Sequence, residues 1–236
     1  MKEPILLLPG MMCDARVFQP QIADLSRDWP VQVACYGDAD SIDKMAQAAL
    51  ATAPARFALA GHSMGGIVAM EVLRRAPERV TRVALMSTSP LAQTGAEAAW
   101  RAPLVDMARA GDLARALTGS MPPENLAPGP GRAAILTLFQ EMGEAMGAAR
   151  FIRHSRALET RPDAQDVLKS ARSAALILCG AHDRMTPLRR HEAMAGLIAH
   201  SQLEVLADAG HFPMLEAPEA VNQALRIWMD RPLMLR

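Results

Sequence analysis

The sequence carries no net charge, because its 25 basic residues offset its 25 acidic ones. A protein that binds nucleic acid or an anionic membrane attracts it with an excess of positive charge, so the balance argues against both partners. Long apolar runs are also missing, and none is long enough to cross a bilayer. Residues 5–8 are too short for the core of a signal peptide, and Pro9 and Gly10 interrupt them. We therefore expect a cytoplasmic protein.

Cysteine is scarce, with three residues at positions 13, 35 and 179. An odd number suits a reducing compartment better than a disulfide-linked domain. The three show neither C-x-x-C spacing nor a histidine cluster nearby, so no metal site is predicted. A chain of 236 residues, of which 50% are hydrophobic, is long enough for one sizeable core and short for two domains.

Short apolar segments alternate with helix-length segments along most of the chain. Runs of this kind, bounded by turn residues, are typical of strands in a parallel sheet that is buried on both faces. Their alternation with helices predicts a doubly wound α/β sheet with right-handed crossovers. The expected strands are 5–8, 31–34, 57–60, 83–86, 175–179 and 203–206, and the expected helices include 41–53, 67–75 and 219–229.

The most informative segment is GHSMG at residues 61–65, which has the pattern G-x-S-x-G. It follows one expected strand directly and precedes an expected helix. A serine at such a sharp strand-to-helix turn, here Ser63, is the nucleophile elbow of an α/β-hydrolase. Glycines are needed there because the backbone at the serine is strained and neighbouring chains pass close to it.

Two later loops offer partners for this serine. Asp183 lies in GAHDRMTP after strand 175–179, and His211 lies in AGHFPMLEAPE after strand 203–206. Both follow the carboxyl ends of apolar strands, where an α/β sheet places its active site. We predict that Ser63 is the nucleophile, that His211 is its general base, and that Asp183 orients His211 and stabilises its charged form. Asp208 is a back-up for the acid.

With these motifs the chain resembles α/β-hydrolase-fold enzymes of the esterase, lactonase and C–C hydrolase branch. Four motifs carry the resemblance: LLLPG at the first strand, GHSMGG at the elbow, and the two loops above. The segment LPGMMCDARVFQPQ is also similar to the corresponding region of enol-lactonases. The resemblance implies chemistry without a cofactor, and an oxyanion hole made by the backbone N–H groups of Met11 and Met64. His62 is expected to be structural, with its side chain directed away from the catalytic face.

Two departures from the family pattern affect the expected fold. Only four residues precede the first strand, which looks like the third strand of the family, so the usual antiparallel N-terminal hairpin is predicted to be missing. The expected sheet is all parallel, with about six strands. Its uncovered edge makes either a monomer or a homodimer conceivable. Pro9-Gly10 replaces the His-Gly of the family, which leaves the shape of the oxyanion loop open.

Residues 90–170 interrupt the alternation and are predicted to form a helical cap over a core made of residues 1–89 and 171–236. Helix-like pieces at 96–111, 113–118, 132–146 and 149–158 flank a proline-rich stretch. In the last piece Arg150, Arg153 and Arg156 recur every three residues and share one helix face. Some relatives hold a substrate carboxylate with a cap arginine, so these three are candidates for that role. A solvated helix face is the competing interpretation.

The leading hypothesis is a serine hydrolase that cleaves a small-molecule carboxylic ester, lactone or thioester through an acyl-enzyme on Ser63. The same three side chains serve C–C bond hydrolases and the lyase of menaquinone synthesis, which form the second hypothesis. A non-catalytic ligand-binding protein on this fold is the third.

Overall fold

The computed structural model describes residues 2–232. Six strands form one sheet in the order β2-β1-β3-β4-β5-β6, and all neighbouring strands are parallel. The predicted all-parallel sheet is confirmed, and in residues 2–232 no antiparallel hairpin is attached to it. The strands are β1 (Ile5–Leu8), β2 (Val31–Val33), β3 (Phe57–His62), β4 (Val80–Met86), β5 (Ala174–Gly180) and β6 (Ser201–Leu206).

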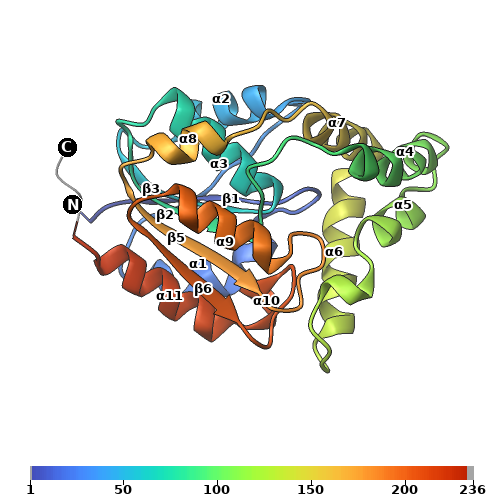
Figure 1. Ribbon diagram of the computed structural model, residues 1–236. Coiled ribbons are helices and arrows are strands. Elements are labelled where there is room, and N and C mark those ends of the chain that lie inside the picture. Colours follow the sequence, from blue (N-terminus) through green and yellow to red (C-terminus); the bar gives the residue numbers. More distant parts are fainter. Residues whose placement is uncertain (1, 233–236) are drawn as a thin grey trace.

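Helices cover both faces of the sheet (Figure 1). One face packs against α1 (Gln19–Leu25) and α11 (Pro218–Asp230). The other packs against α2 (Ile42–Thr52), α3 (Met64–Arg75), α8 (Gln165–Ser170) and α9 (Leu188–Leu197). In β1, for example, Ile5 and Leu7 join the first cluster, whereas Leu6 and Leu8 join the second. Burial on both sides explains the continuous apolar runs of these strands.

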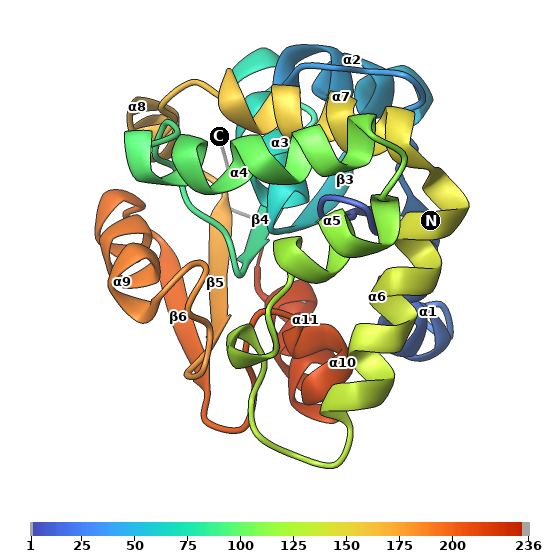
Figure 2. The same ribbon diagram turned by 90° about the vertical axis from the view of Figure 1, so that its right-hand side faces the viewer.

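A further group of helices lies beyond the carboxyl ends of the strands (Figures 1 and 2). It contains α4 (Gly95–Arg109), α5 (Leu113–Ser120), α6 (Arg132–Met146) and α7 (Ala148–Glu159), and a short helical turn, Pro123–Asn125, follows α5. We call α4 to α7 with their connections the cap. α8 also falls within residues 90–170, but it contacts α3 and α9 beside the sheet. The division of the chain into core and cap at residue 170 therefore stays a prediction.

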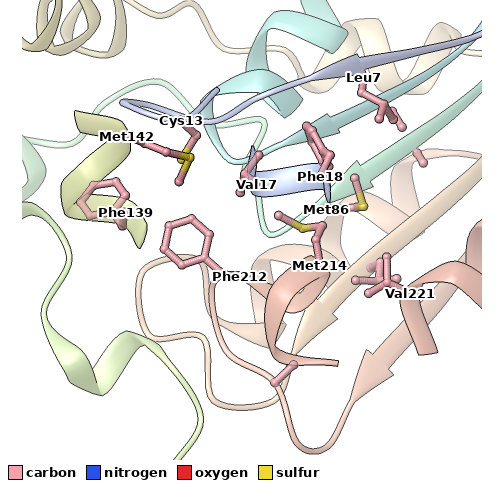
Figure 3. Close-up of a cluster of buried hydrophobic side chains, with 14 of the residues drawn as sticks. Leu7, Cys13, Val17, Phe18, Met86, Phe139, Met142, Phe212, Met214 and Val221 are labelled. Atoms are coloured by element: carbon pink, nitrogen blue, oxygen red, sulfur yellow. The ribbon is translucent and has the colours of Figure 1, made fainter. Parts of the chain in front are cut away.

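One buried apolar cluster runs from the α1 and α11 face of the sheet to the cap (Figure 3). Phe139 and Met142 of α6 lie at its cap end, and Val221 of α11 lies at its far end. Phe212, the neighbour of His211, lies between them, with its ring centroid 5.7 Å from that of Phe139. Aromatic packing therefore holds the cap against the loop that carries His211. The loop itself runs into the short helix α10 (Pro213–Glu216).

Within residues 2–232, no helix combines the length and the apolar character that a membrane span requires. In the same range, no three His, Cys, Asp or Glu side chains gather as ligands for a metal ion.

Candidate active site

Ser63 occupies the sharp turn between β3 and α3 with φ 52° and ψ −118°. A positive φ is unfavourable for a residue with a side chain, so the surrounding structure must hold this conformation. The Ser63 N–H donates to the carbonyl oxygen of Met86 in β4 over 3.0 Å. A Cβ atom at Gly65 would collide with the carbonyl of Leu8, so the turn requires glycine there.

The side chains of Ser63, His211 and Asp183 form one hydrogen-bonded series. Ser63 Oγ lies 3.0 Å from His211 Nε2, and His211 Nδ1 lies 2.9 Å from Asp183 Oδ2. An ionised carboxylate only accepts hydrogen bonds, so His211 Nδ1 carries the proton and donates to Asp183. Nε2 of the neutral ring is then free to accept the Ser63 hydroxyl. The structure brings together the three residues that the sequence singled out, on loops after β3, β5 and β6.

Asp183 is buried, and its carboxylate is fully engaged. Oδ1 accepts the N–H groups of Met185 and Thr186, each over 2.9 Å, and Oδ2 accepts the Thr186 hydroxyl over 2.6 Å. Burial raises the pKa of Asp183, but interaction with His211 and the bonds from Thr186 outweigh it and bring the pKa to about 2. Asp208, the back-up acid, is exposed to solvent.

The loop of His211 is held by a carboxylate that the sequence analysis did not identify. Glu216 accepts the N–H groups of Gly210, Phe212 and Ala127 over 2.7 to 2.9 Å. Ala127 belongs to the cap, so Glu216 joins cap and loop. Burial raises the pKa of Glu216 even though the three N–H groups favour its ionised form. Its place within the AGHFPMLEAPE motif was the available signal.

His62, at the end of β3, also holds the loop of His211. Its Nε2 donates to the carbonyl oxygen of His211 over 2.7 Å, and the two ring centroids lie 5.2 Å apart. Burial, together with the neighbouring His211, lowers the pKa of His62 to about 3, so the ring is neutral at pH 7. The expectation that this side chain points away from the catalytic face is wrong. In β3, His62 shares the face of Ala58 and Ala60, which is the face that the His211 loop crosses.

The loop after β1 carries one of the two predicted oxyanion donors. Tyr36 Oη donates to the Pro9 carbonyl oxygen over 3.0 Å, and Met12 adopts a φ of 55°. The backbone N–H groups of Met11 and Met64 have no hydrogen-bond partner within residues 2–232. Both residues line cavities that also contain Ser63. The Pro9-Gly10 sequence is thus compatible with an ordered loop beside the serine.

Two cavities open onto Ser63. The larger has a volume of about 520 Å³, and its apolar wall includes Ile67, Trp100, Leu158 and Met185. The smaller, of about 50 Å³, contains Met11 and His211. The charged side chains that line the larger cavity are Glu97, Arg101, Glu124, Arg161, Arg184 and Arg190.

The three cap arginines that the sequence analysis proposed as carboxylate ligands are not brought to Ser63. Arg153 pairs with Asp38 over 2.6 Å, and Arg156 pairs with Asp40 over 3.1 Å. Neither of these residues, nor Arg150, lines a cavity that contains Ser63. For Arg153 and Arg156 the structure therefore favours the competing interpretation of a solvated helix face. Other arginines reach the cavity instead.

Comparison with known proteins agrees with this geometry. Residues 5–224 match the model of the alpha/beta hydrolase family. The chain is 29% identical over 203 residues to pimeloyl-[acyl-carrier protein] methyl ester esterase of Aromatoleum aromaticum. The matched region covers 76% of each protein. It is also 29% identical over 164 residues to 2-hydroxymuconate semialdehyde hydrolase of Pseudomonas sp. strain CF600, which covers 67% of this chain and 56% of that protein. The chain thus spans little more than half the length of the latter.

A solved structure shows the same fold. The enol-lactonase of Burkholderia xenovorans LB400 superposes with a TM-score of 0.85 at 20% identity, over 98% of this chain and 92% of that one. The resemblance to esterases, lactonases and C–C hydrolases that the four motifs indicated is thereby confirmed.

Proposed function

We propose that this chain, which belongs to the alpha/beta hydrolase family, is a serine hydrolase that cleaves a carboxylic ester, lactone or thioester. One observation carries the proposal. The unbroken series from Ser63 Oγ through His211 to Asp183, with contacts of 3.0 and 2.9 Å, is the arrangement that activates a serine hydroxyl.

The proposed reaction runs through an acyl-enzyme. Ser63 Oγ attacks the substrate carbonyl carbon while His211 Nε2 takes the hydroxyl proton. The N–H groups of Met11 and Met64 hold the resulting oxyanion. As the bond to the leaving alcohol or thiol breaks, His211 returns the proton to it. Water then attacks the acyl-enzyme, again with His211 as base, and releases the carboxylic acid and free Ser63. No step calls for a cofactor.

The first test is hydrolysis of 4-nitrophenyl esters from acetate to decanoate by the wild type and Ser63→Ala, with fluorophosphonate labelling read by mass spectrometry. We expect turnover by the wild type, label on Ser63, and loss of both in Ser63→Ala. The profile over chain length would then measure the depth of the acyl site. Absence of both label and turnover would contradict the proposal and favour a ligand-binding protein on this fold.

Hydrolysis of a C–C bond is the second candidate, together with the related lyase reaction. Two observations favour keeping it: the similarity to 2-hydroxymuconate semialdehyde hydrolase, and the presence of arginines in the cavity beside Ser63. Label on Ser63 without turnover of any ester in the series would favour this candidate. The cytoplasmic location and the monomeric or homodimeric state remain part of the proposal, and size-exclusion chromatography with light scattering tests the latter.

A further inference from the structure

Arg101 extends from the cap helix α4 into both cavities that contain Ser63. Its Nε atom is buried and has no hydrogen-bond partner. Its Nη1 atom donates to the sulfur of Met11 over 3.5 Å, and a thioether is a weak acceptor. Among residues 2–232, no carboxylate lies within ion-pair distance of the guanidinium. The guanidinium carbon also lies 5.5 Å from the centre of the Trp100 ring, which is no anion. Because a buried cation without an anionic partner is costly, this arrangement favours the binding of an anion.

Two of the other arginines that line the larger cavity, Arg161 and Arg190, have charged partners. Arg161 and Arg190 both pair with Glu97, over 2.5 and 2.9 Å. Arg161 also donates to the carbonyl oxygens of Leu91 and Leu158. Glu97 itself is fixed by the N–H of Thr94 at the start of α4. This network is satisfied within the protein. Of the four arginines that line the larger cavity, Arg184 is exposed, and Arg101 is the one that combines a buried donor with the lack of a charged partner among residues 2–232.

The charge of the larger cavity also favours the binding of an anion. Four arginines and two glutamates line it, an excess of two positive charges in a chain whose net charge is zero. Burial and the charge of Arg161 lower the pKa of Arg101 to about 10, which still leaves it protonated at pH 7. A concave site with apolar walls concentrates the field of such charges and attracts anions.

We propose that Arg101 binds a carboxylate on the same molecule whose carbonyl Ser63 attacks. The preferred substrates are then half-esters of dicarboxylic acids, or lactones that bear a carboxylate. A carboxylate suits the site because the planar guanidinium can bind both of its oxygens at once. This inference rests on the proposed function, since it supplies the substrate class for the same serine.

The test compares mono-4-nitrophenyl glutarate with 4-nitrophenyl pentanoate, which share the leaving group and the chain length. The variants are Arg101→Gln, Arg101→Lys and the control Arg109→Gln. Arg109 lies on the same helix and forms an exposed pair with Asp106. We expect the wild type to prefer the glutarate ester. Arg101→Gln should lower kcat/KM for that ester about tenfold or more beyond its effect on the pentanoate ester, chiefly through KM.

Arg101→Lys should retain part of the preference, because it keeps the charge but not the planar pair of donors. Arg109→Gln should behave as the wild type. Equal effects of Arg101→Gln on the two esters, with Ser63 still labelled by fluorophosphonate, would overturn this inference and leave the proposed function intact.

A binding measurement separates the two proposals if no ester is hydrolysed. Glutarate itself is titrated into the wild type, Arg101→Gln and Arg109→Gln by calorimetry. Binding that Arg101→Gln loses and Arg109→Gln keeps would support the anion site even without esterase activity. Equal binding by all three proteins, or none, would refute it.

Discussion

His154 Nδ1 accepts a hydrogen bond from the backbone N–H of Met12 over 3.3 Å. His154 lies on the cap helix α7, and Met12 follows directly on Met11, the proposed oxyanion donor. The bond therefore ties the cap to the oxyanion loop. Tyr36 holds the other end of that loop through the Pro9 carbonyl. A side chain of the cap thus helps to set where the Met11 N–H points.

Replacement of His154 should impair the proposed chemistry without any contact to substrate. His154→Phe leaves the Met12 N–H buried without an acceptor, which costs about 1–3 kcal/mol of stability. A displaced oxyanion donor should lower kcat about tenfold to 100-fold, with a smaller change in KM. His154→Asn is the control, because its amide oxygen lies near the position of Nδ1. Equal kcat values for the two variants would contradict this positioning role.

The stability of the protein should fall in mild acid. Burial, with Arg150 and Arg153 nearby, lowers the pKa of His154 to about 4, and burial also lowers that of His191 to about 4. Below the ordinary histidine pKa of 6.5, the unfolded chain gains protons that the folded one does not. The contribution of these two histidines to the free energy of unfolding is complete above pH 6.5. It is lost as the pH falls towards 4, by up to about 1.4 kcal/mol per pH unit for each histidine.

Urea unfolding between pH 7 and pH 4 measures this dependence. His154→Asn keeps an acceptor for Met12 but cannot titrate, so its free energy of unfolding should fall by about one proton less steeply than that of the wild type. Identical slopes in the two proteins would show that His154 titrates normally in the folded state.

Asp183→Asn tests the proposed role of the acid. The variant presents an amide in place of the carboxylate that accepts the hydrogen bond from His211 Nδ1–H, so the ring takes the wrong tautomer more readily. We expect kcat to fall about 10³- to 10⁴-fold, with little change in KM. Asp208→Asn serves as the control and should be unaffected, since Asp208 is exposed. A larger loss in Asp208→Asn than in Asp183→Asn would reverse the assignment.

Glu216 should prove important although it is outside the proposed catalytic series. Glu216→Ala leaves three N–H groups without their acceptor, including those on both sides of His211. A loss of about 2 kcal/mol or more is expected, together with a lower kcat. Glu219→Ala, a change in the first turn of α11, is the matched control. Thermal unfolding and ester kinetics of the two variants give the comparison. An unchanged melting temperature for Glu216→Ala would refute the role of Glu216 in holding the His211 loop.

For Arg153 and Arg156 of the cap helix α7 we predict no effect on substrate binding. Arg153→Gln and Arg156→Gln should leave KM for both the glutarate and the pentanoate ester unchanged. Each loses only an exposed ion pair, and such pairs contribute little to stability. A raised KM for the glutarate ester alone would restore these residues as carboxylate ligands.

The inner strands of the sheet, β1 and β3 to β5, could be predicted from the sequence because they are buried on both faces. The strand at 5–8 matches β1, and 31–34 and 175–179 lie within one residue of β2 and β5 at each end. β4 begins earlier than predicted, at Val80, because Arg82 hides the apolar pattern. That arginine is buried in the structure and pairs with Glu3 over 3.1 Å. A buried ion pair has no signal in a hydropathy pattern.

The helices of the cap could be predicted from the sequence, but the side of each helix that faces Ser63 could not. A spacing of three places Arg150, Arg153 and Arg156 on one side of α7, yet nothing local says which side faces Ser63. That choice depends on the contacts of Phe151, His154 and Leu158, which are buried in the structure. Arg101 could not be singled out from the sequence for the same reason. The proposal for it rests on the lack of a charged partner, which can be seen only in the folded structure. Long-range contacts decide both cases.

The stretch that follows α5 has a consequence for how such enzymes diversify. The Asn125 carbonyl accepts the His211 N–H over 2.8 Å, and the Ala127 N–H is bound by Glu216. Replacement of the whole cap would therefore also replace the two backbone groups that hold the loop of His211. The cap helices are tied to the core as well, through His154 of α7 and Phe139 of α6. Recombination or engineering of the cap should therefore keep residues 122–127 together with 210–216, as one unit split across the chain.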